Sequence, residues 1–254
     1  MTKRLWFSLT ASVTVLALLL VLFSMSSSLL ADNDGPSNCR GLPTQSQLRS
    51  LLIAAQTSGG TVGGLFGGTR MWGAVVNRDG EICAYTTSTN DPTQVWPGSQ
   101  AIAKSKAYTA NAFSLDTLAL STARLYTFTQ PGHSLWSLGQ SNPFDPQYLA
   151  PPSGSGGGRN QIAGGQIFFG GGVPLYNSDG EIIGGFGASG DTSCADHEIA
   201  KRVRNLAGLN PPGGSLVDDI VYSPPDAPSV FAHPKCLNTF RNGVFIGTET
   251  PASY

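Results

Sequence analysis

The sequence contains few charged residues, and the two signs nearly cancel. Lys and Arg together number 15 and Asp and Glu 16, so the formal net charge is -1, and charged residues make up 12% of the 254 positions. A protein that binds nucleic acid through its phosphates normally has a clear excess of basic residues. We therefore expect no nucleic-acid partner, but a small molecule or another protein.

Histidine is also scarce, and common catalytic motifs are missing. The histidines are His133, His197 and His233, and no spacing connects them with Ser189 as a Ser-His-Asp triad. The serine motif G-x-S-x-G is absent, as is the C-x-x-C-H motif that attaches c-type haem. These absences favour a binding protein over a classical enzyme and exclude covalently attached haem.

One glycine motif has the wrong surroundings for a nucleotide site. Gly185–Gly190 matches G-x-G-x-x-G, but a dinucleotide site also needs a βαβ unit with an acidic residue at the end of the next strand. Here the preceding strand belongs to a predicted hairpin, and a Pro-Pro-Gly-Gly loop at 211–214 follows the next helix. We expect these glycines to allow close approach to a helix, a neighbouring subunit or a flat ligand.

The N-terminus has the pattern of an export segment. Lys3 and Arg4 precede an uncharged, apolar stretch over 5–23, and small residues follow up to Ala31. This pattern predicts that 1–31 is a signal peptide or a retained N-terminal membrane anchor. We therefore expect a periplasmic or extracellular protein, associated with a membrane only if the segment is retained.

Two Asp-Gly pairs indicate β-hairpins. Asp79-Gly80 lies within 71–85 and Asp179-Gly180 within 174–185, and apolar or β-branched residues flank each pair. Glycine accepts the positive φ that a tight hairpin turn requires. The sequence therefore predicts two antiparallel hairpins.

Capping signals and apolar spacing predict four helices. Thr44–Gln47 forms a capping box before the first helix, which ends at Ser58-Gly59-Gly60. The other helices are predicted over 99–113, 116–128 and 193–206, and a late strand over 219–222. Helices separated in sequence from hairpins indicate an α+β fold with an antiparallel sheet.

The chain after the export segment is long enough for one domain. We expect a short leader over 32–41, a domain over 42–209 and a C-terminal tail over 210–254 packed on the domain. A long Gly/Pro/Ser-rich loop over 143–165 interrupts this domain. Loops of that length are commonly functional or mobile.

Four cysteines allow two interpretations. The doublets Cys194-x-x-His197 and His233-x-x-Cys236 offer the ligands of one tetrahedral zinc ion. An exported chain with an even number of cysteines more commonly forms disulfides. We favour the pairs Cys194–Cys236 and Cys39–Cys83, and the sequence leaves the zinc alternative open.

Lys106 is a charged residue on an otherwise uncharged helix face. It shares this face with Ile102, Thr109 and Phe113. Its stem can lie on apolar surface while its ammonium group reaches water or an anion. The lysine either lies at a helix edge in contact with water or binds a carboxylate, such as a haem propionate.

Three segments resemble the GlcG/HbpS haem-binding family, which is also related to the C-terminal domain of PduO. Residues 96–110 resemble the family's A-x-x-K-A-x-T-A helix, and 170–176 its G-G-x-P-[LI] entry to a strand. Residues 183–200 resemble its G-x-[IL]-G-[VA]-S-G…D-x-x-[IA]-A close. The segments follow in the family's order within residues 42–209.

The resemblance implies a profilin-like fold, in which helices flank an antiparallel sheet of about five strands. It also implies a haem or related tetrapyrrole ligand and a homo-oligomer, a dimer or larger. His197 is its candidate haem-iron ligand. The cofactor-binding residues that it implies are Lys106, Thr109, Ser189, Gly190, Asp196 and His197.

These observations lead to one main functional hypothesis and two alternatives. The main one is an exported haem-binding protein that scavenges haem or senses redox state. The first alternative is an oligomeric structural or interaction protein that has no ligand. The second is a zinc-binding protein that uses Cys194, His197, His233 and Cys236.

Overall fold

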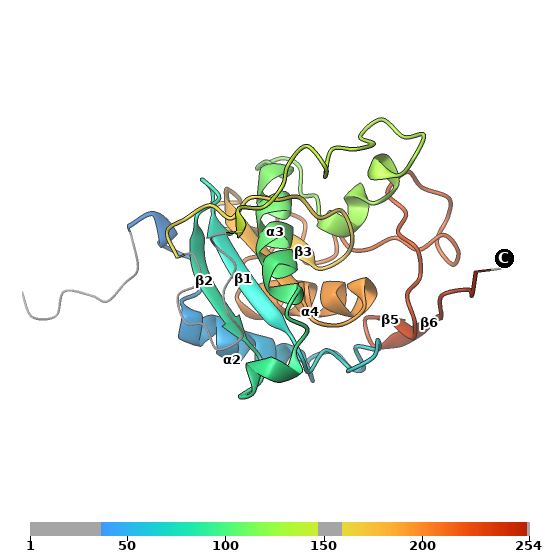
Figure 1. Cartoon of the computed structure of the whole chain (residues 1–254), viewed down its shortest axis with the longest axis horizontal. Helices are drawn as coiled ribbons and strands as arrows, with labels where there is room; N and C mark the ends of the chain where they lie inside the picture. The colour runs from blue at the N-terminus through green and yellow to red at the C-terminus, as the bar shows by residue number, and fades with distance from the viewer. Residues whose placement is uncertain (1–36, 147–158, 253–254) are drawn as a thin grey trace, which may run out of the picture. The chain divides into compact units, whose positions relative to one another are not determined.

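The computed structural model describes residues 37–146 and 159–252 (Figure 1). The predicted export segment 1–31, most of the leader 32–41 and the middle of the loop 143–165 lie outside the described residues. In the described part of the chain, no helix is long and apolar enough to cross a membrane.

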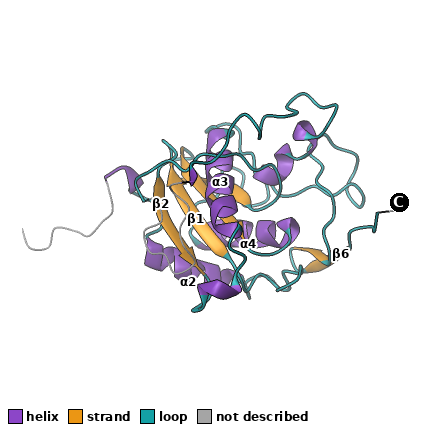
Figure 2. Cartoon of the chain, viewed as in Figure 1, coloured by secondary structure: helices purple, strands orange, loops and turns teal. Residues whose placement is uncertain are grey.

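In the described residues, the regular structure contains three α-helices and six strands, and Figure 2 distinguishes helices, strands and loops by colour. The helices are α2 (Gln45–Ala55), α3 (Ser99–Ala112) and α4 (Ser193–Leu206). The strands are β1 (Trp72–Asn77), β2 (Ile82–Thr87), β3 (Gly172–Tyr176), β4 (Ile182–Ser189), β5 (Thr239–Arg241) and β6 (Val244–Gly247). The short 3-10 helices are η1 (Ser37–Cys39), η2 (Pro92–Gln94), η3 (Thr122–Leu125) and η4 (Thr127–Thr129).

The main sheet is antiparallel, with the strand order β2-β1-β4-β3. Helix α3 packs on one face, and α2 and α4 pack on the other (Figure 1). The predicted α+β fold with an antiparallel sheet flanked by helices is confirmed. Within the described ranges this sheet has four strands, where the resemblance implied about five, and β5 and β6 form a separate hairpin.

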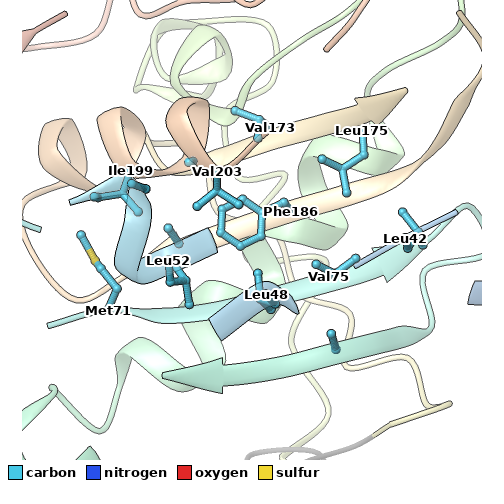
Figure 3. Close-up of a cluster of buried hydrophobic side chains, with 14 of the residues drawn as sticks. Leu42, Leu48, Leu52, Met71, Val75, Val173, Leu175, Phe186, Ile199 and Val203 are labelled. Atoms are coloured by element: carbon cyan, nitrogen blue, oxygen red, sulfur yellow. The ribbon is translucent and has the colours of Figure 1, made fainter. Parts of the chain in front are cut away.

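Side chains alternate between the two faces of the sheet, as the pleat of a strand requires. Val75 and Phe186 belong to the apolar cluster under α2 and α4, whereas Ala74 and Val76 belong to the cluster under α3. In Figure 3, Phe186 lies at the centre of the first cluster, near Leu52 of α2. Burial of both faces explains why β1 is apolar along its length.

The local signals in the sequence form the predicted contacts. The Thr44 hydroxyl accepts from the Gln47 amide, and the Gln47 side chain accepts from the Thr44 amide at 2.8 Å. Gly80 and Gly180 occupy the hairpin turns with φ of +88° and +83°. In β4, a Cβ atom at Gly185 or Gly187 would collide with the backbone of α3. The glycine motif therefore allows a helix to lie directly on the sheet.

The predicted helix over 116–128 is wrong. That segment contains turns and the short 3-10 helices η3 and η4. Its hydroxyl groups bond to distant backbone oxygens: Ser121 to that of Asp218, and Thr122 to that of Phe169, both at 2.6 Å. Such bonds compete with helix formation.

The predicted strand over 219–222 is also wrong, because only an isolated bridge between Val221 and Ala232 forms there.

Candidate functional site

The six predicted site residues lie on three elements that contact one another, α3, β4 and α4. Lys106 and Thr109 lie on α3, Ser189 and Gly190 at the end of β4, and Asp196 and His197 in the first turns of α4. Each of the five that have side chains is buried. We call this region the α3–β4–α4 junction.

Lys106 and Asp196 form a buried ion pair at the centre of the junction. The Lys106 Nζ lies 2.7 Å from Asp196 Oδ2 and donates to the Ala188 oxygen at 3.2 Å. The other Asp196 oxygen accepts from the Asp191 amide at 2.9 Å. Burial lowers the pKa of Lys106 and raises the pKa of Asp196 to about 6, and each charge partly offsets the other's shift. The anion that Lys106 contacts is therefore a side chain of this protein.

The segment before β3 covers this ion pair. The Phe169 ring centroid lies 4.8 Å from Lys106 Nζ. A Cβ atom at Gly171 would lie 2.6 Å from the same nitrogen, and one at Gly170 would lie 3.0 Å from His197 Cβ. The glycines thus bring the backbone directly onto the junction.

Thr109 and Ser189 are also enclosed. The Thr109 hydroxyl donates to the Ser105 oxygen at 2.7 Å and accepts from the Ile167 amide at 3.0 Å. Ser189 pairs with Trp72 across the sheet. Gly190 lies so close to the Arg70 oxygen that no side chain fits there.

His197 points to the C-terminal tail. Its Nε2 lies 3.2 Å from Asp219 Oδ1, and its Nδ1 is buried with no hydrogen-bond partner. Asp219 also accepts from Lys201 at 2.9 Å. Burial alone would raise the pKa of Asp219, but the contacts with His197 and Lys201 hold that pKa far below its usual range.

The cysteines form the disulfides Cys39–Cys83 and Cys194–Cys236. These are the two pairings favoured from the sequence, and they are typical of an oxidising environment. His233 lies beside Cys194 and Cys236, and ligand atoms of the three residues lie within 4.8 Å of one another. His197 contacts Asp219 and is not part of this group, so the four predicted zinc ligands do not assemble.

Asp191 and Asp219 also contact residues of the junction, and neither is among the predicted site residues. Asp191 accepts from the amides of Leu65, Phe66 and Gly68. Thr192 caps α4. These three partners of Asp191 are more than a hundred residues away in the chain, so no local pattern indicates them.

A pocket lies apart from the junction, between the start of α2 and the end of α4. Its volume is about 630 Å³, within the range of roughly 300–1,000 Å³ that small-molecule sites occupy. Apolar and small polar side chains line it, and none is a His, Cys, Met or Tyr. The lining residues are Gly41, Leu42, Pro43, Ser46, Gln47, Ser50, Leu51, Ala207 and Leu209.

Comparison with protein families identifies the group to which the chain belongs. Residues 53–204 match a family model described as "Haem degrading protein HbpS-like". The chain belongs to the HbpS-like family. No curated protein matches it.

Several solved structures are similar to this HbpS-like chain. The protein ORFY of Klebsiella pneumoniae is 20% identical, with a TM-score of 0.44, and the match covers 64% of this chain and 86% of that one. A structure named as a PduOC–haem complex is 22% identical, with coverages of 65% and 92% and a TM-score of 0.46. HbpS is 19% identical, with coverages of 63% and 82% and a TM-score of 0.39.

The junction of this HbpS-like protein, in the conformation that the structure shows, has no room for a haem. Lys106 is bound to Asp196, and the backbone of Gly170 and Gly171 occupies the space beside them. The unpartnered Nδ1 of His197 is a potential iron ligand, but the same backbone packs against that side chain. The side chains and backbone of the junction therefore contact one another and leave no space there for a haem.

Proposed function

We propose that this protein binds haem or a related tetrapyrrole. The observation that carries the proposal is the match of residues 53–204 to the HbpS-like family model, whose description names haem as the molecule on which its members act. We propose binding rather than degradation, since the pocket between α2 and α4 offers no side chain that ligates iron.

This pocket is the proposed ligand site. Leu42, Leu51 and Leu209 supply apolar surface, and Ser46, Gln47 and Ser50 supply polar groups at its edge. Small-molecule sites generally combine apolar walls with a few polar groups. A porphyrin held by such contacts binds through its ring, so the iron contributes little to the affinity.

The test compares haem with iron-free protoporphyrin in absorption titrations of the disulfide-bonded protein. Ser50→Trp fills the pocket, and Ser141→Trp is its matched control, because both side chains are exposed and each hydroxyl group donates to a nearby backbone oxygen. We expect both porphyrins to bind the wild type, and Ser50→Trp to weaken both while the control does not.

Two other results of these titrations would contradict parts of the proposal. Binding of haem alone that is lost in His197→Gln would contradict the pocket and support His197 as the iron ligand. Binding of neither porphyrin to folded protein would contradict the proposed function.

We also propose export and self-association. Export is supported by the two disulfides and by the apolar segment in 1–31. Self-association is supported by three exposed apolar side chains of the β5–β6 hairpin and the residues just before it: Leu237, Val244 and Phe245 are 49%, 63% and 56% exposed. Light scattering of the purified protein is expected to give the mass of a dimer or a larger oligomer, and a monomer would contradict self-association.

A further inference from the structure

The Cys194–Cys236 disulfide lies beside a histidine that is positioned to bind a metal ion. Ligand atoms of Cys194, His233 and Cys236 all lie within 4.8 Å of one another, and the three residues are buried. While the disulfide is intact, its sulfur atoms are bonded to each other and no thiolate is available.

We propose that reduction of this disulfide creates a binding site for Zn²⁺ or a similar divalent ion, formed by the thiolates of Cys194 and Cys236 and by Nε2 of His233. A dithiol reductant breaks the S–S bond, gives two thiols and becomes a disulfide itself. Binding of the metal ion then releases the two thiol protons to solvent. Two thiolates and an imidazole are a preferred ligand set for zinc, and a fourth coordination position stays open.

The orientation of His233 supports this assignment. Its Nδ1 lies 2.7 Å from the Pro234 oxygen, so Nδ1 carries the proton and Nε2 has the lone pair that can bind a metal ion. Metal-binding histidines commonly donate the other ring N–H to a backbone oxygen in this way. The Gly170 amide now donates to Nε2 at 3.2 Å, and a bound ion would replace that hydrogen bond.

The surroundings of Cys236 favour a thiolate. The Cys194 amide, in the first turn of α4, lies 3.1 Å from the Cys236 sulfur, and the Ser193 hydroxyl lies 3.2 Å from it. Hydrogen-bond donors at a helix N-terminus stabilise a thiolate. The same groups thus stabilise the charge that appears on reduction.

The chain arrangement also favours chelation. His233 and Cys236 come from one short segment of the tail, and Cys194 comes from α4. An ion bound by all three would hold the tail against α4, as the disulfide does in the oxidised protein. The site thus exchanges one cross-link for another when the redox state changes.

The test uses Co²⁺ as a spectroscopic substitute for Zn²⁺, with the full chain before and after reduction by a phosphine, which contains no competing thiol. We expect no binding to the oxidised protein. The reduced protein should bind one equivalent, with a thiolate-to-cobalt absorption band that Zn²⁺ abolishes. His233→Ala should weaken Co²⁺ binding by more than about tenfold. Even the loss of a residue that only hydrogen-bonds to a metal ligand weakens metal binding by about that factor.

Two controls separate this site from other thiols. His197→Gln and the double variant Cys39→Ser/Cys83→Ser should both bind Co²⁺ like the wild type. The proposal is overturned if the reduced wild type shows no such band, or if His233→Ala binds equally well. If the reduced metal-free chain unfolds, added Zn²⁺ must restore its circular dichroism spectrum, and a failure to do so also overturns the proposal.

Discussion

Removal of the Lys106 ammonium should expose the energetic role of the buried ion pair. The variant Lys106→Met keeps an apolar side chain of similar length but has no ammonium group. The carboxylate of Asp196 stays buried, and the Asp191 amide is its remaining hydrogen-bond donor. Breaking a buried pair on one side generally costs about 3–5 kcal/mol. The whole free energy of unfolding of a domain is about 5–15 kcal/mol, so this loss is large.

The loss should depend on pH in a definite direction. The pKa of Asp196 is raised to about 6 even with Lys106 present, and Lys106 acts to lower it. Without Lys106 this pKa rises further, whereas in the unfolded chain it is about 3.9. An acid with a raised pKa in the folded state destabilises the protein above that pKa, and protonation removes the penalty. The variant should therefore lose less stability at pH 5 than at pH 8.

Urea unfolding of the disulfide-bonded protein at both pH values measures the effect. Lys106→Met/Asp196→Leu should recover much of the loss, since apolar replacement of both partners is often neutral. Arg159→Met, at an exposed position, is the control for loss of one positive charge. A loss below about 1 kcal/mol for Lys106→Met at pH 8, or a larger loss at pH 5, would refute this reasoning.

Three further variants, one of them with a matched control, test other parts of the structure by urea unfolding. Gly187→Ala should destabilise the protein by about 1–3 kcal/mol or more, because its Cβ meets the backbone of α3, whereas Gly98→Ala, which meets nothing within 4 Å, should be nearly neutral. Asp191→Ala should lower the free energy of unfolding by about 3 kcal/mol, because three backbone amides lose their acceptor. It should also increase proteolysis within 63–69, and an unchanged rate of proteolysis would contradict this prediction. Cys194→Ser/Cys236→Ser removes a cross-link between residues 42 positions apart. This change should lower the free energy of unfolding by about 4 kcal/mol, and an unchanged value would contradict a stabilising role of the disulfide.

Local sequence signals predicted most of the regular structure. The capping box at Thr44, the Asp-Gly turns and the spacing of apolar residues in α4 act over a few residues, and each forms as expected. The segment 116–128 was expected to be a helix because a capping signal precedes apolar residues at helical spacing. It is not one, because its hydroxyl groups bond to distant parts of the chain.

The site was less predictable because its contacts are long-range. The position of Lys106 on an apolar face indicated that its charge needs water or an anion, but it did not identify the anion, Asp196, which lies 90 residues further along the chain. The partner of His197, Asp219, belongs to a segment that was expected to be a strand. A single sequence shows the need for such partners but does not identify them.

The most direct test of the account is an absorption spectrum of the purified, disulfide-bonded protein with one equivalent of added haem. Binding predicts a shifted Soret band that saturates at one haem per chain, and a weaker shift in Ser50→Trp. Folded protein that leaves the spectrum of free haem unchanged would contradict the central claim that this HbpS-like protein binds a tetrapyrrole.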